Sequence, residues 1–225
     1  MKLERLDEFS SFLEKEATSA IDELSKVAEK SRQHLQKLVY TNIVDRFDAT
    51  IDHLLLENVT EEPLLSEALS QLKDNLSEGQ ILGLISKSES IGEVVKEKTE
   101  NVLRNGVLRN RHSAKLRKLF EAFRITEDFA LPRVNPSTAA IVKKHKPQNK
   151  SIPCSILGYS DWLYSRRNAI VHGGGSVSML QNDIDQLKRL YKCDASKTVR
   201  LKIGSLTNTV KYYQNLILLI KEDIG

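Results

Sequence analysis

Residues that interrupt, bend or cross-link a chain are scarce in this sequence. Its 225 residues include only 10 glycines, 5 prolines and 2 cysteines. So little glycine and proline excludes a collagen-like or loop-dominated architecture. The two cysteines, Cys154 and Cys193, cannot build a disulfide framework or a zinc site on their own. The histidines outside the segment 165–173 are His34, His53, His112 and His145, which lie in unrelated segments without ligand spacing. We expect no metal and no other cofactor.

Long apolar runs are also missing. The longest, Leu216–Ile220, is much shorter than the ~20 residues that span a bilayer, and the charged first residues lack the apolar core of a signal peptide. Aromatic residues make up 6% of the chain in no regular array, which argues against a stacking platform for single-stranded bases. No G-x-x-x-x-G-K-S/T motif is present, so NTP hydrolysis at a P-loop is excluded. We expect a cytoplasmic protein with no membrane partner.

Charge is unevenly distributed along the chain. Residues 1–100 carry 12 basic and 21 acidic side chains, a net charge of −9. Residues 101–225 carry 22 basic and 9 acidic side chains, a net charge of +13. An acidic front and a basic back indicate an anionic partner or internal charge pairing. Alternatively, the acidic and the basic half each present a solvated charged face without a partner.

The first 62 residues contain neither glycine nor proline, and their apolar residues recur at steps of three and four. This spacing predicts helices over Leu3–Val27 and Leu35–Leu55. One unbroken helix would be about 80 Å long at ~1.5 Å per residue, longer than a compact domain of this size. We therefore predict two long antiparallel helices with a break near Ala28–Arg32 and Ser31 as the N-cap of the second.

Beyond Pro63, which ends this unit, the pattern predicts shorter helices. Residues 131–154 hold four prolines and four lysines, which predicts a loop with a short helix at Ser137–Lys144. Thr198–Ile203 alternates apolar and basic residues, as in a short strand or an extended segment. Long helices with so little strand signal predict an all-α helical bundle. The other predicted helices are 64–77, 80–104, Arg109–Phe123, Tyr159–Val171, one from about Ser178, and a last one from Ser205, as N-cap, to Glu222.

One segment, Ser165–Gly173, combines residues suited to chemistry on a phosphate. Arg167, Asn168 and His172 lie within six residues, separated by small and apolar side chains and followed by three glycines. Asn168 and His172 share a helix face, whereas Arg167 and His172 are about 140° apart on an ideal helix. The arginine and histidine can therefore converge on one substrate only if the helix end is distorted or if two copies of the chain combine.

An arginine and a histidine suffice for metal-independent cleavage of RNA. Histidine can move a proton at neutral pH, arginine can bind the phosphate and stabilise its transition-state charge, and RNA supplies the 2′-hydroxyl nucleophile. The simpler alternative is structural. In that case His172 stabilises the helix C-terminus and Arg167 forms a surface ion pair.

The sequence Arg167-Asn168, three residues, then His172 resembles the R-x4–6-H motif of HEPN (higher eukaryote and prokaryote nucleotide-binding) domains. In that motif a polar residue often follows the arginine. Two long helices come first, and a closing helix follows the motif, as in the bacterial RiboL-PSP-HEPN and related groups, which are associated with defence and RNA processing. The resemblance implies one domain over residues 1–225. Its bundle of four to five core helices comes from 1–60 and 155–225, and 64–154 form an inserted helical and loop region.

The same resemblance implies a homodimer whose two motifs face one another in a composite RNase site. It gives Arg167 as the phosphate-binding residue, Asn168 as the polar residue beside it and His172 as the catalytic histidine. Arg166 also has an allowed spacing, and an earlier helix often adds an acidic residue, for which Asp45 and Asp48 are both candidates. Such proteins are often toxins or antiviral effectors, with RNA as substrate and an antitoxin or other protein as partner. The alternative is a non-catalytic HEPN-type module that binds RNA, nucleotide or protein.

A second basic segment, residues 104–118, contains six cations and no acidic residue. Such a cluster can bind a phosphate backbone without sequence preference, whereas the alternative is a solvated helix face. We predict RNA contacts for Arg104, Arg109, Arg111, Lys115, Arg117 and Lys118.

Overall fold

The computed structural model describes residues 2–71, 77, 79, 82, 83, 86, 91–173 and 178–222. Over these residues the fold is a helical bundle without β-strands, and extended pairing is limited to two isolated bridges, Val134–Ile141 and Ser178–Thr198. The prediction of an all-α bundle is confirmed. No helix in this described part is long and apolar enough to cross a membrane.

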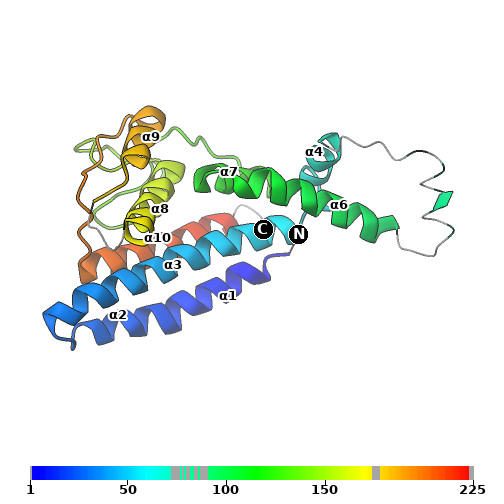
Figure 1. Cartoon of the computed structure of the whole chain (residues 1–225). Coiled ribbons are helices and arrows are strands. Elements are labelled where there is room, and N and C mark those ends of the chain that lie inside the picture. Colours follow the sequence, from blue (N-terminus) through cyan, green and yellow to red (C-terminus); the bar gives the residue numbers. More distant parts are fainter. Residues whose placement is uncertain are drawn as a thin grey trace.

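The helices follow the predicted order, with shifted ends (Figure 1). The predicted helix 64–77 is described as far as Ser70, and most of residues 72–90 lie outside the described residues. A 3-10 turn, Val107–Arg109, separates two of the helices. The helices are α1 (Glu4–Phe12), a π-helical segment (Leu13–Ala17), α2 (Thr18–Leu24), α3 (Glu29–Glu57), α4 (Leu64–Ser70), α6 (Ile91–Asn105), α7 (His112–Ala122), α8 (Ile156–His172), α9 (Gln181–Tyr191) and α10 (Ile203–Glu222).

The first two helical units form the predicted antiparallel pair, in which α1 and α2 run back along α3 (Figure 1). The predicted break is confirmed, but Ser31 as N-cap is wrong. Ala28 is the extended residue that precedes α3, and no side chain caps it. Instead, the guanidinium of Arg32 donates two hydrogen bonds, of 2.7 and 3.0 Å, to the carbonyl of Val27 and closes the turn.

The core is built where α10 packs against this pair and α8 crosses α3. The rings of Phe9, Phe47 and Tyr213 lie within 5.8 Å of one another, centroid to centroid. The buried hydroxyl of Tyr40 on α3 donates to the carbonyl of Leu163 at 2.8 Å and fixes the position of α8. Because α8 packs against α3, α7 and α9, its residues are buried on several sides, and its exposed residues are the last two, Val171 and His172.

Two local predictions between the helices are wrong. Ser137–Lys144 is not helical. Residues 136–138 form a turn, in which the carbonyl of Asn135 accepts the amides of Thr138 and Ala139, and Ile141 pairs with Val134 in an isolated bridge. Ser205 is not an N-cap, since α10 begins at Ile203 and the amide of Ser205 already donates to the carbonyl of Lys202.

Gly158, in the first turn of α8, is a position where the backbone packs closely. A Cβ atom there would lie 2.7 Å from Pro153 Cβ, 2.7 Å from Ser155 Oγ and 3.0 Å from Tyr191 Cδ1. Ser155 Oγ also caps α8 by accepting the amide of Gly158. We expect Gly158→Ala to lower the free energy of unfolding by about 1–3 kcal/mol in spite of the better helix propensity of alanine.

Urea unfolding measures this loss, and Gly204→Ala is the matched control. Gly204 also lies in the first turn of a helix, but a Cβ there meets nothing within 4 Å. We expect the control to unfold like the parent chain, and an equal loss in both variants would contradict the close packing at Gly158.

Candidate functional site

Arg167 lies on α8 and is held by a carboxylate from α3. Its Nε is 2.5 Å from Asp45 Oδ1, and its guanidinium carbon is 5.6 Å from the ring centroid of Tyr164, one turn earlier on α8. The Arg167 side chain keeps 19% of its surface exposed and that of Asp45 keeps 42%. The pair is therefore partly open to solvent on the side of Asp45, where an incoming anion can compete with Asp45 for the guanidinium.

Asn168 connects this arginine to a second helix. Its Oδ1 accepts a hydrogen bond from Arg167 Nη1 at 3.2 Å, and its Nδ2 donates to Asp183 on α9 at 3.3 Å. Asp183 also pairs with Arg111, which lies just before α7, at 3.3 Å. The hydrogen bonds to Arg167 and Asp183 together fix the side-chain amide of Asn168 with its oxygen toward Arg167.

His172 is the last residue of α8, and its side chain is exposed. No described residue bonds to its imidazole, although Gly174 and Gly175, which follow, lie outside the described residues. The helix is regular to its end, since the amide of Gly173 donates to the carbonyl of Ala169 at 3.0 Å. Arg167 and His172 therefore point about 140° apart within one chain, and no helix distortion brings them together.

Arg166, the competing arginine, lies in the interior and is only 7% exposed. Its guanidinium stacks between Trp162 and Tyr40, at 4.5 and 5.4 Å from their ring centroids, and donates to the carbonyl of Arg200 at 2.7 Å. It therefore holds the segment before α10 against α8 and is not placed to reach a substrate.

The neighbouring arginines should accordingly differ in their effect on stability. We expect Arg166→Ala to lower the free energy of unfolding by about 2–4 kcal/mol, because it removes a buried stack and leaves the Arg200 carbonyl unpaired. We expect Arg167→Ala to cost less than about 1 kcal/mol, because the ion pair that it removes has a half-exposed carboxylate and because Asn168 keeps its bond to Asp183. Urea unfolding of both variants measures the difference, and equal losses would contradict the two environments.

Asp48, the second acidic candidate, is bonded to side chains of α7. Its carboxylate lies 2.8 Å from His112 Nδ1 and 3.0 Å from Lys115 Nζ, and Lys115 also contacts Asp52 at 3.1 Å. Burial alone would raise the pKa of Asp48, but the hydrogen bonds and charges of His112 and Lys115 hold that pKa below its ordinary value. Of the two carboxylates, only Asp45 is bonded to Arg167.

The basic segment 104–118 is not a set of unopposed cations. Four of its six members form ion pairs with carboxylates: Arg104 with Glu100, Arg111 with Asp161, Lys115 with Asp48 and Lys118 with Glu67. Within the described part of the chain, Arg109 and Arg117 have no carboxylate partner, and Arg117 instead stacks on Phe129. The prediction overlooked these pairs because most of the carboxylates come from other helices.

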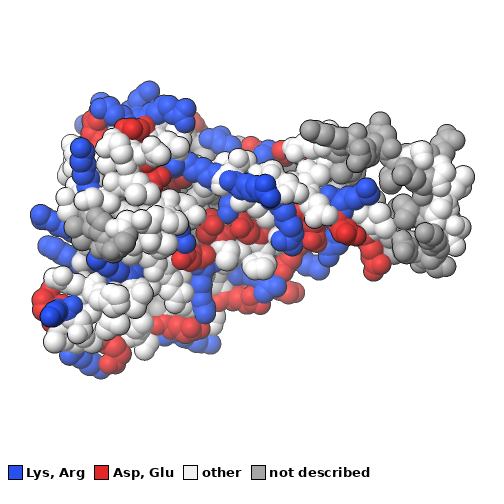
Figure 2. Space-filling model, viewed as in Figure 1, with Lys and Arg blue, Asp and Glu red and all other residues white. Residues whose placement is uncertain are grey.

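Internal pairing also accounts for part of the charge asymmetry. Cations of the second half reach acids of the first half, and Figure 2 shows acidic side chains at the middle of one face with basic ones around them, rather than a uniformly basic face. The pairs are Arg167–Asp45, Lys115–Asp48, Lys118–Glu67 and Lys221–Asp7.

Neither a metal site among the described residues nor a similarity to known proteins indicates which reaction the site could perform. Among the described residues, no group of three or more His, Cys, Asp and Glu side chains is placed to hold a metal ion. No protein-family model, curated protein or solved structure matches this chain. A function must therefore be inferred from the geometry of α3, α8 and α9.

Proposed function

We propose that this chain is an HEPN-type endoribonuclease that cleaves RNA without a metal, with Arg167 and His172 as its catalytic side chains. One observation supports this proposal most. Arg167 is partly open to solvent with Asp45 and Asn168 bonded to it, and the helix that carries it ends at an exposed histidine.

In this reaction Arg167 exchanges its bond to Asp45 for the phosphate of the RNA. An arginine can donate two hydrogen bonds to a phosphate and stabilise the charge that develops on it. His172 takes the proton of the 2′-hydroxyl as its oxygen attacks phosphorus, and the P–O5′ bond breaks. The protonated imidazole then gives this proton to the 5′-oxygen as it leaves, and the products are a 2′,3′-cyclic phosphate and a 5′-hydroxyl end.

The divergence of Arg167 and His172 favours a site shared by two chains. A two-fold dimer can bring the arginine of one copy to the histidine of the other. Two exposed apolar side chains lie on the same helices. Leu38, 52% exposed, is two turns before Asp45, and Val171, 45% exposed, is one turn after Arg167. Their burial against a second copy would stabilise such a dimer.

Product analysis tests the proposed reaction. Purified protein incubated with RNA in EDTA should produce fragments with 2′,3′-cyclic phosphate and 5′-hydroxyl ends. Cleavage that requires an added divalent cation, or that leaves 5′-phosphate ends, would refute the mechanism. As a toxin or defence effector, the chain should also slow growth on expression, and an antitoxin-like partner should relieve this effect.

A non-catalytic binding module is the second candidate, and the 2.5 Å contact between Arg167 and Asp45 favours it. A guanidinium held by its own carboxylate is a stable surface ion pair and needs no substrate. Under this alternative the protein binds RNA with a steep salt dependence but releases no fragments. Gel-shift and cleavage assays on the same RNA separate the two candidates.

A further inference from the structure

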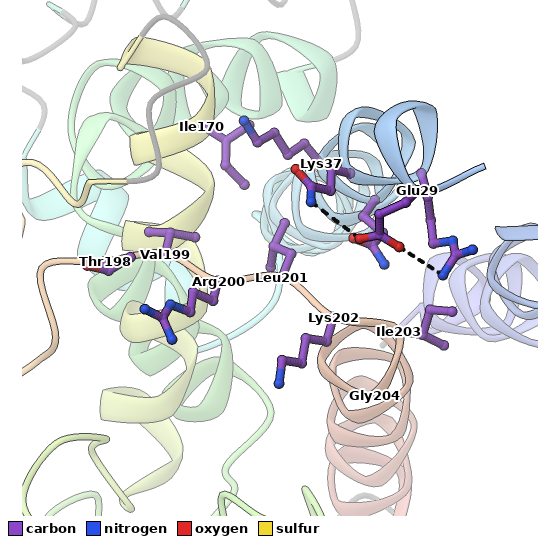
Figure 3. Close-up of a pocket in the computed structure, with 13 residues that line it drawn as sticks. Glu29, Lys37, Ile170, Thr198, Val199, Arg200, Leu201, Lys202, Ile203 and Gly204 are labelled. Carbon is purple, nitrogen blue, oxygen red and sulfur yellow. Dashed lines mark hydrogen bonds and ion pairs between the residues drawn. The ribbon is translucent and has the colours of Figure 1, made fainter. Parts of the chain in front are cut away.

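A pocket of about 770 Å³ lies apart from the Arg167–Asp45 pair, between the start of α3, Ile170 on α8 and the segment 198–204 that leads into α10 (Figure 3). Its volume is within the range of small-molecule sites. Arg167, Asn168 and His172 do not line it. Any ligand of this pocket would therefore be bound by residues outside the proposed cleavage site.

Cations outnumber acids around this pocket. Arg200 and Lys202 line it on one side and Lys37 on another, as Figure 3 shows. Its one acidic residue, Glu29, is already engaged, at 3.2 Å by Arg32 and at 3.3 Å by Gln33. The rim is therefore suited to an anion.

The N-terminus of α10 opens onto the same pocket. The amides of Ser205 and Leu206 donate to the carbonyl of Lys202, whereas those of Ile203 and Gly204, the first two residues of the helix, have no acceptor among the described residues. A Cβ on Gly204 would meet nothing within 4 Å, so the approach to these amides is open. Free amides at a helix N-terminus favour a phosphate.

Gln36 supplies an independent sign of a ligand. Its side chain lines the pocket and is 6% exposed, yet its amide forms no hydrogen bond with any described residue. An alkyl chain over this amide would leave its donor and its acceptor unpaired, which is unfavourable. The ligand should therefore carry hydrogen-bonding groups at its inner end.

Four apolar residues also line the pocket: Ile170, Val199, Leu201 and Ile203. We infer that the pocket binds a small phosphorylated ligand of the nucleoside monophosphate class. Its phosphate lies at Arg200, Lys202 and the start of α10, and the hydrogen-bonding edge of its ring lies at Gln36. A free nucleotide and the 5′-phosphorylated end of an RNA carry this same chemistry.

Calorimetric titration of the full chain tests the inference with the four 5′-mononucleotides, adenosine and inorganic phosphate. At least one mononucleotide should bind about tenfold or more tightly than either adenosine or phosphate alone. The double variant Arg200→Ala/Lys202→Ala should weaken that binding by about tenfold or more, and Gln36→Leu should reduce it toward the affinity for phosphate. The control, Lys188→Ala/Arg189→Ala, removes two exposed cations of α9 and should bind like the parent chain.

Oligonucleotides distinguish the two sources of the ligand. With the His172→Ala chain, a 5′-phosphorylated RNA that competes with the mononucleotide, while its 5′-hydroxyl counterpart does not, identifies an RNA end as the ligand. Competition by neither RNA identifies a free nucleotide. Absence of binding by all four mononucleotides and by the 5′-phosphorylated RNA would overturn the inference, as would unchanged binding in the Arg200/Lys202 variant. Neither result would affect the cleavage assay, because the pocket and the cleavage site share no residue.

Discussion

His172→Ala should reduce the rate of RNA cleavage by about a hundredfold or more without unfolding the protein. The imidazole is the only proposed group that moves a proton between the 2′-hydroxyl and the leaving oxygen, and general acid–base catalysis contributes about 10²–10⁴-fold. Its side chain is exposed at the end of α8, so alanine removes at most a favourable interaction with the helix dipole, worth about 0.3–1 kcal/mol. Initial rates on a defined RNA in EDTA, with urea unfolding of the same samples, measure both quantities.

His53→Ala is the matched control, because His53 is also an exposed histidine on a helix, α3. It should cleave RNA at the parent rate. Arg167→Ala should lose about 10²–10³-fold, in line with the removal of one transition-state donor. Parent-like cleavage by both His172→Ala and Arg167→Ala would remove this site from the reaction.

Asp161→Ala should be strongly destabilising, with a loss of about 3–5 kcal/mol in the free energy of unfolding. Asp161 is fully buried on α8, where its carboxylate accepts hydrogen bonds from Arg111 Nε at 2.7 Å, from the amide of Ser113 at 3.1 Å and from the hydroxyl of Tyr191 at 2.8 Å. Burial and this carboxylate raise the pKa of Tyr191, so its phenol remains a donor. Removing Asp161 leaves these three donors without their acceptor.

Asp185→Ala is the control for that variant. Asp185 lies on the exposed face of α9 and accepts a hydrogen bond only from Gln181 among the described residues. It should change the free energy of unfolding by less than about 0.5 kcal/mol. If Asp161→Ala loses no more than this control, the buried carboxylate does not join α7, α8 and α9 as described.

Apolar spacing was sufficient to predict the helical pair and the break between its members, because burial of one helix face is a local and periodic property. The helix ends were less predictable. Arg32 closes the turn before α3 through side-chain hydrogen bonds to the backbone carbonyl of Val27. The preference of serine for N-cap positions does not reveal such a contact. Near Ser137 the chain turns because the carbonyl of Asn135 accepts two backbone amides, and the spacing of apolar residues does not predict this turn.

The site was predictable in its local part only. Arg167, Asn168 and His172 are close together in the sequence. Asp45 is 122 positions from Arg167, and the sequence could not distinguish it from Asp48 as the acidic residue of the site. Asp183 and Tyr164, which contact Asn168 and Arg167, were missed. Asp161 is a carboxylate among the apolar residues of α8, and such a residue indicates a charged partner from elsewhere in the chain, which is Arg111.

Co-expression of two inactive chains tests most directly whether Arg167 and His172 act together across a dimer. A chain with Arg167→Ala keeps the histidine, and a chain with His172→Ala keeps the arginine. In a shared site their heterodimer retains one complete pair of side chains, so a statistical mixture should recover about a quarter of the parent cleavage rate in EDTA. If the co-expressed chains cleave RNA no faster than either variant alone, the shared site is contradicted.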